Sequence, residues 1–173
     1  MRSISLALAG VALTASLALS GCGGKGADHK TNAVPSSSTS AVDDRAAALA
    51  FRKSFDDASE TFLDVSRTST DDIQRGLNAD PESAAQIFGD LQAAYTGVAE
   101  KFNAITPPPA YEADYKAFLD VINELPDDFG TVVGAAKARD AAAGGDAARA
   151  AQASLHKAGL LGESLGKRLQ KLS

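Results

Sequence analysis

The chain has 173 residues, and its 17 basic and 22 acidic side chains give a formal net charge of −5. This acidic balance disfavours nucleic acid as a partner, because a phosphate backbone is bound by a basic surface. The single cysteine, Cys22, excludes a disulfide framework within the chain, and the length after residue 21 is enough for one domain. Abundant alanine, sparse β-branched residues and the absence of tryptophan favour helix over sheet.

The first 21 residues have the pattern of a signal peptide. Arg2 supplies a positive charge, and residues 4–19 form an apolar run that contains nothing more polar than serine, threonine and glycine. Because a stable transmembrane helix needs about 20 apolar residues, this run is a little short for a membrane span. The sequence therefore predicts an exported protein from which residues 1–21 are removed.

The apolar run ends in Leu19, Ser20, Gly21 and Cys22, and these four residues resemble the bacterial lipobox. The resemblance implies that signal peptidase recognises the first three residues and cuts before Cys22, whose thiol carries a diacylglycerol. The protein would then be anchored to the outer face of the cell membrane, and a diacyl group holds firmly where a single acyl chain does not. The alternative is an ordinary secretory signal peptide that is cut elsewhere, with Cys22 incidental.

Residues 22–42 are predicted to be the lipidated cysteine followed by a flexible tether. They are rich in glycine, serine and proline and show no apolar period. A flexible chain of about 20 residues has a root-mean-square span near 25 Å, which would hold the following domain clear of the lipid headgroups. His29 lies in this stretch between charged residues and is interpreted as a solvated side chain.

The first helix is expected over residues 43–66. Asp43 and Asp44 suit a helix N-terminus. Apolar residues then follow at alternating spacings of three and four, which is the pattern of a buried helix face: Ala48, Phe51, Phe55, Ala58, Phe62 and Val65. The polar stretch 66–70 interrupts the pattern, and the sequence leaves open whether residues 71–78 form a separate helix or continue the first.

Two further helices are expected over residues 81–105 and 108–143. Asp80 and Pro81 are a strong start signal for the second helix, and the three prolines at 107–109 stop it. In the third stretch the three–four alternation of apolar residues continues on both sides of Pro126. We therefore expect one helix with a kink at this proline rather than two separate helices.

The last helix is expected over residues 146–171, after a turn at Gly144 and Gly145 with Asp146 as its cap. Three glycines lie close together within it, at positions 159, 162 and 166. Because each glycine destabilises a helix interior by about 1 kcal/mol relative to alanine, they have either of two uses, a close approach between helices or a groove. Four apolar faces joined by short connections predict an all-α domain, an antiparallel four-helix bundle over residues 43–173.

The candidate site residues are few. His156 is the single histidine of the predicted bundle, and no Glu-x-x-His pair suited to a di-iron centre is present, so no metal site and no cofactor are predicted. No nucleophile is linked to a base by any sequence pattern, so no catalytic residues are predicted. Tyr95, Tyr111, Tyr115, His156 and Gly162 are the residues that could form a ligand groove between helices.

Over its whole length the chain resembles the small alanine-rich lipoproteins of high-GC Gram-positive, actinobacterial-type bacteria. The lipobox carries this resemblance, together with a Pro-Pro-Ala-Tyr corner at residues 108–111 and a Gly-Asp turn at 145–146. The resemblance implies a place, the outer face of the cell membrane, and a helical fold, but no task. The anchor, the long tether and the absence of a recognisable catalytic set favour a non-enzymatic envelope lipoprotein whose helical domain binds a protein partner or a small ligand. Two alternatives stay open: a haem, metal or small-molecule carrier or enzyme that uses His156 and the tyrosines, and a structural spacer in the envelope.

Overall fold

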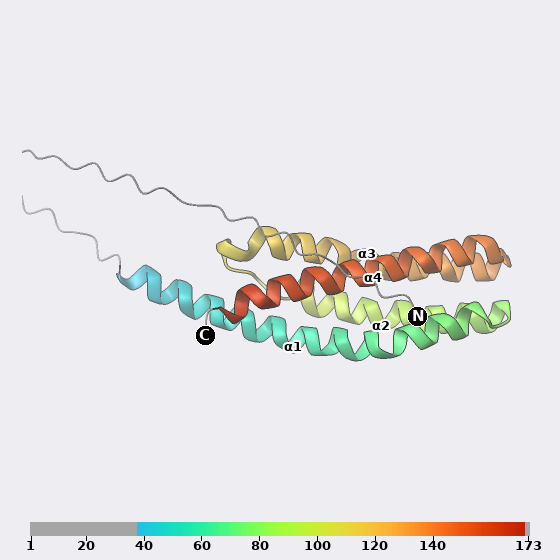
Figure 1. Cartoon of the computed structure of the whole chain (residues 1–173), viewed down its shortest axis with the longest axis horizontal. Helices are drawn as coiled ribbons and strands as arrows, with labels where there is room; N and C mark the ends of the chain where they lie inside the picture. The colour runs from blue at the N-terminus through green and yellow to red at the C-terminus, as the bar shows by residue number, and fades with distance from the viewer. Residues whose placement is uncertain (1–37, 172–173) are drawn as a thin grey trace, which may run out of the picture. The chain divides into compact units, whose positions relative to one another are not determined.

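The computed structural model describes residues 38–171, with their side chains from residue 42 onward. This part of the chain contains four long helices and no strand: α1 (Ser38–Leu77), α2 (Pro81–Asn103), α3 (Glu112–Ala138) and α4 (Ala141–Gln170), with a short 3-10 helix η1 (Pro109–Tyr111) before α3. The predicted all-α bundle is confirmed (Figure 1). The predicted signal peptide, the lipobox and tether residues 22–37 lie outside the described residues.

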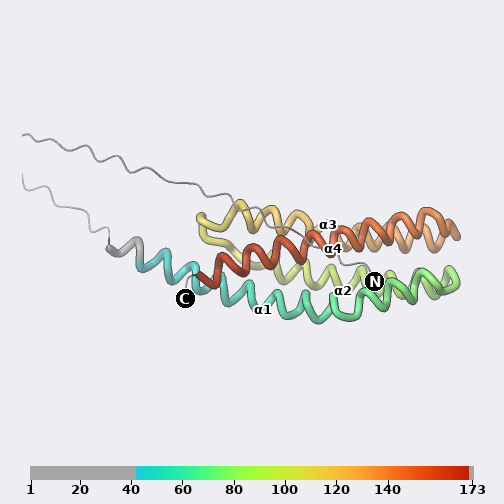
Figure 2. Tube along the Cα trace, in the orientation of Figure 1, coloured from blue at the N-terminus to red at the C-terminus, as the bar shows by residue number. Residues whose placement is uncertain are grey.

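Each helix packs against the next along the chain, and α4 also contacts α1. Figure 2 shows the four helices running lengthwise along the bundle. The α2–α3 and α3–α4 interfaces are extensive, whereas α1 and α4 touch sparsely. Within residues 38–171 we find no helix with both the length and the apolar character that a membrane span requires. The sparse α1–α4 interface is the feature that positions the candidate site.

Aromatic side chains from three helices fill the core. Phe102 of α2 and Phe118 of α3 meet edge to face, with 4.8 Å between ring centroids. Further along the bundle, Tyr95 and Phe129 stack with their ring planes 12° apart. By contrast, α4 contributes mainly small residues to the core. Its buried side chains are Ala148, Ala151, Ala158, Leu165 and Leu169.

Helix α1 is longer than predicted at both ends and has no interruption at residues 66–70. Its chain contains neither glycine nor proline between Pro35 and Gly76, so nothing stops the helix. The buried face continues through Ser69, which is only 1% exposed. Its hydroxyl lies 2.7 Å from the Val65 carbonyl oxygen and 2.8 Å from the Tyr95 hydroxyl, so the polar group is satisfied inside the core. Residues 71–77 therefore belong to α1.

The N-terminal end of α1 projects beyond the other three helices (Figure 1). The prediction that the tether extends to residue 42 was wrong, because α1 begins at Ser38. The side chains of residues 42–47 are all exposed, and Ala48 is the first buried residue of the described side chains. This exposed segment contains two alanines and no helix breaker, which suits a helix that continues without packing partners.

The junction between α3 and α4 also differs from the prediction, which placed a turn at residues 144–146. Helix α3 ends at Ala138, Arg139 takes the left-handed conformation with φ 58°, and the Asp140 carboxylate caps α4 by accepting from the Ala143 N–H at 3.0 Å. Asp140 competes with Asp146 as the cap and succeeds because three alanines follow it directly. Gly144 and Gly145 consequently lie inside the first turns of α4.

Helix α3 begins at Glu112 rather than at the predicted residue 108, because η1 takes up the end of the proline corner. It then passes through Pro126 without a break, as expected from the phase of its apolar residues. Leu125 and Phe129, on either side of the proline, are both completely buried. The missing proline N–H is thus tolerated because the buried face on both sides stays in register.

Candidate functional site

A groove of about 890 Å³ runs between α1 and α4, where the two helices touch sparsely. It spans about 27 Å along α1, from Phe55 to Ile73, and about 21 Å along α4, from Gln152 to Gly166, at a rise of 1.5 Å per residue. Phe118 of α3 closes its floor. The residues of α1 and α4 that line it are Phe55, Asp56, Ser59, Phe62, Leu63, Ser66, Thr70, Ile73, Gln152, Leu155, His156, Ala158, Gly159, Leu160, Gly162, Glu163 and Gly166.

The floor of the groove is apolar and continuous with the core. Phe55, Phe62 and Phe118 are buried members of the core cluster that also line the groove. At the rims stand two exposed leucines, Leu63 on α1 and Leu160 on α4, with exposed fractions of 51% and 55%. Exposed leucines on both walls of an apolar groove mark a surface suited to binding rather than to contact with water alone.

Three glycines of α4, at positions 159, 162 and 166, line the groove. A Cβ atom added at Gly159 or at Gly166 would meet no atom within 4 Å, so these two positions do not hold another helix close. At Gly162 an added Cβ would lie 3.3 Å from the Phe118 ring, which places this glycine directly over the floor. Of the two uses that the sequence leaves open for the glycines, the geometry of Gly159 and Gly166 favours the groove.

The charged side chains that line the groove are acidic. Asp56 of α1 lies 3.6 Å from the Arg52 guanidinium, and Glu163 of α4 lies 2.5 Å from the Lys167 ammonium, in each case on the same helix. The hydrogen bond and charge of Lys167 lower the pKa of the Glu163 carboxyl, so that it is ionised at neutral pH. Neither lysine nor arginine belongs to the groove lining itself. Each wall of the groove therefore carries one carboxylate, whose basic partner lies one turn away on the same helix and outside the lining.

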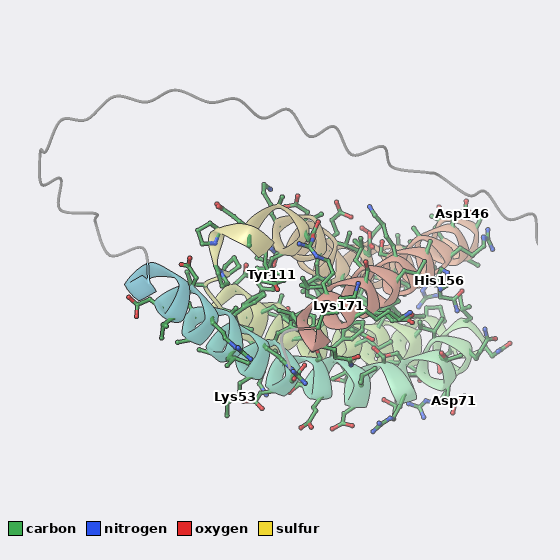
Figure 3. All side chains as sticks on the ribbon, turned by 60° about the vertical axis from the view of Figure 1, so that its left-hand side comes forward. Lys53, Asp71, Tyr111, Asp146, His156 and Lys171 are labelled. Atoms are coloured by element: carbon green, nitrogen blue, oxygen red, sulfur yellow. The ribbon has the colours of Figure 1, made fainter. Side chains whose placement is uncertain are left out.

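The predicted site residues fall into two groups. His156 and Gly162 line the groove, and Figure 3 shows His156 on the surface of α4. The tyrosines do not line it. Tyr95 and Tyr115 use their hydroxyls inside the core, and Tyr111 packs at the end of the bundle where α4 ends, with the Arg168 guanidinium 5.2 Å from its ring centroid.

Sequence reasoning missed the α1 wall of the groove. A second stripe with alternating spacings of three and four runs beside the buried face of α1, but it mixes polar and apolar residues and so was not recognised. Its members are Asp56, Ser59, Leu63, Ser66, Thr70 and Ile73. Among residues 42–171, the structure brings together no group of three or more histidine, cysteine or acidic side chains that could hold a metal ion.

The two buried tyrosine hydroxyls give the fold a pH dependence. The Tyr115 hydroxyl donates to the Phe102 carbonyl oxygen at 2.6 Å, and the Tyr95 hydroxyl lies 2.8 Å from that of Ser69. Burial raises the pKa of both phenols above the ordinary value of 10.0. The stability that the protonated phenols contribute is complete below about pH 10, where neither state ionises, and it is lost as the pH rises toward the folded-state pKa.

We expect the free energy of unfolding to fall above about pH 10, by up to about 1.4 kcal/mol per pH unit for each of the two tyrosines. Urea unfolding followed by circular dichroism at a series of alkaline pH values measures this slope. Tyr115→Phe should show a shallower slope than the parent chain, because one of the two phenols is gone. Equal slopes for the two proteins would contradict the assignment.

Comparison with protein-family models, with curated proteins and with solved structures found no match to this chain. The functional assignment therefore rests on the chain's own residues and on the groove geometry.

Proposed function

We propose that this chain is an exported, lipid-anchored binding protein of the bacterial envelope whose α1–α4 groove holds a partner or ligand without chemical turnover. The observation that carries the proposal is the groove, whose volume of about 890 Å³ lies in the range of about 300–1,000 Å³ typical of binding pockets. Its apolar floor would supply affinity, and its few polar groups would orient what it holds. The carboxylates at its walls are paired with basic residues of their own helices, which suits recognition rather than proton transfer.

The proposed location is supported by residues that precede the bundle. The positive charge of Arg2, the apolar run over residues 4–19 and the Leu-Ser-Gly-Cys ending together match the requirements of lipoprotein processing. Among these residues, the lipobox is the specific part of the resemblance to small alanine-rich actinobacterial-type lipoproteins. An anchor at Cys22 would attach the bundle by its N-terminal side to the outer face of the cell membrane.

Cys22→Ser tests the anchor. In cells grown with a clickable palmitate analogue, the parent protein should incorporate the label and show the mass of a diacylglycerol at its N-terminus, because the thiol is the acceptor. The Cys22→Ser variant should incorporate none, and Ser20→Ala, which leaves the thiol in place, should label like the parent. Labelling of Cys22→Ser at the parent level, or an unlabelled parent, would refute the lipid anchor.

The groove itself is tested with an apolar fluorescent dye. The chain from residue 22 onward with Cys22→Ser carries no lipid and keeps all of the described helices, α1 to α4. We expect a dye such as 1-anilinonaphthalene-8-sulfonate or the uncharged N-phenyl-1-naphthylamine to gain fluorescence in the groove, the uncharged dye more strongly because the walls are acidic. No gain with either dye would contradict a groove that binds apolar groups.

A further inference from the structure

The lining of the groove has the spacing of a helix-packing surface on both walls. On α1 it includes residues 56, 59, 63, 66, 70 and 73, and on α4 residues 152, 156, 159, 163 and 166, so both stripes alternate spacings of three and four. The buried faces with which these helices pack inside the bundle have this same spacing. Such a stripe runs along a helix and presents holes into which the side chains of a neighbouring helix fit. The spacing on each wall is therefore suited to packing against one further helix.

The dimensions of the groove also fit a helix. Its length of about 21–27 Å corresponds to four or five helical turns of 5.4 Å. Gly159 and Gly166 leave open space in the α4 wall, and the absence of a side chain allows a second backbone to come close. The rim leucines, Leu63 and Leu160, stand outside the floor, where a short ligand would leave them exposed and a helix would cover them.

Charge selects the kind of helix. Asp56 stands on one wall and Glu163 on the other, and the lining contains no lysine or arginine to oppose them. Their existing partners, Arg52 and Lys167, lie one turn away on the same helices. The Glu163–Lys167 pair is exposed and contributes little to stability, whereas the Arg52 side chain is half-buried, so Glu163 is the more available of the two carboxylates. The chain as a whole is acidic, with a net charge of −5. Basic side chains on the flanks of an incoming helix would therefore find favourable contacts on both sides.

We propose that the α1–α4 groove binds an amphipathic α-helix of a partner protein, with apolar side chains at three–four spacing on the floor and lysine or arginine on both flanks. This inference rests on the proposed binding function and names the partner class. The recognition mode is a helix laid in a groove, in which anchors at positions i, i+3, i+4 and i+7 enter the apolar floor. A second copy of this chain is a poorer occupant, because its own surface is acidic.

The test uses three labelled peptides of the same length, each about five turns long. The first has leucine and alanine on one face and lysine on the flanks, the second has glutamate in place of lysine, and the third has the composition of the first with the leucines spread around the helix. Fluorescence anisotropy measures binding to the lipid-free Cys22→Ser chain from residue 22. We expect the first peptide to bind about tenfold more tightly than either of the others and to gain helical circular dichroism on binding.

Gly159→Leu supplies the matched structural test. An added side chain has open space there, so the fold should be kept while the groove is filled. Gly134→Leu is the control, because Gly134 is also a helical glycine with no atom within 4 Å of an added Cβ but lies on α3, outside the lining. Gly159→Leu should weaken binding of the first peptide by about tenfold or more, and Gly134→Leu should leave it unchanged.

The peptide and dye measurements distinguish the helix proposal from the proposed binding function. Equal binding of the three peptides, or binding that Gly159→Leu leaves intact, would overturn the helix proposal. Dye binding without peptide binding would overturn it as well and would keep the proposed function with a small apolar ligand. If neither the dyes nor the peptides bind, both the proposed binding function and the helix proposal would be refuted. A dimer in sedimentation analysis that Gly159→Leu dissociates would assign the groove to a second copy and refute the partner helix.

Discussion

Phe129→Ala is expected to lower the free energy of unfolding by about 3–5 kcal/mol, the range for a large aromatic side chain removed from a packed core. Phe129 is 0% exposed. Its ring stacks on Tyr95 with 5.3 Å between centroids and on Phe88 with 6.5 Å between centroids. The truncation would leave a cavity between α2 and α3 and would remove both ring contacts. Urea unfolding monitored by circular dichroism at 222 nm measures the loss.

Leu63→Ala is the control for this substitution. Leu63 is also a large apolar side chain truncated to alanine, but it is half-exposed at the groove rim, so its truncation should change the stability by less than about 0.5–1 kcal/mol. The same variant should weaken binding of the lysine-flanked peptide, because the rim leucine would be part of the contact. A Phe129→Ala protein as stable as Leu63→Ala would show that the rings are not packed as described.

Gly76→Ala is expected to destabilise the fold by about 1–3 kcal/mol, although alanine is the better helix former. A Cβ atom at this position would lie 2.6 Å and 2.9 Å from two carbon atoms of the Phe88 ring. The ring cannot move aside freely, because Phe88 is itself only 1% exposed and stacks on Phe129. The approach of α1 to α2 therefore has to widen at this point. Thermal and urea unfolding of the variant measure the cost.

The matched control is Gly89→Ala on α2. An added Cβ at Gly89 meets no atom within 4 Å, so only the helix propensity changes and the fold should become more stable by up to about 1 kcal/mol. The two glycine substitutions are thus expected to have opposite signs. If both variants were stabilised, the close contact between α1 and α2 at Gly76 would be disproved.

Helix locations in this bundle could be predicted from the sequence because each buried face keeps its period. The Asp80 cap is an example: its carboxylate accepts from the Glu82 and Ser83 N–H groups at 3.0 Å and 3.1 Å, and α2 begins at Pro81 as expected. Ser69 is a residue for which prediction from the neighbouring sequence was wrong. A serine in the stripe looked like an interruption, and its hydroxyl is satisfied by Tyr95, a residue 26 positions away on another helix. Such a long-range partner is not visible in a local pattern.

The predicted position of the turn between α3 and α4 was wrong for a different reason. Asp140 and Asp146 are both good caps, so the capping residue alone does not locate the start of α4; the helix begins after Asp140, where three alanines follow directly. At the candidate site, the sequence identified His156 and Gly162, which line the α4 wall of the groove. It did not identify the residues of the α1 wall. Whether a glycine lets two helices meet or leaves a groove depends on how far the helices stand apart, and one sequence does not fix that distance.

The exposed N-terminal end of α1 has a mechanical consequence. Phe55, where the groove begins, lies 17 positions after Ser38 on one uninterrupted helix, and this distance amounts to about 25 Å of rigid rod. Any force applied through the chain before Ser38 would reach the bundle along this rod rather than through a slack connection. Deleting part of the polar stretch before Ser38 would not change the distance from the start of α1 to the groove. This distance is therefore a fixed property of the fold.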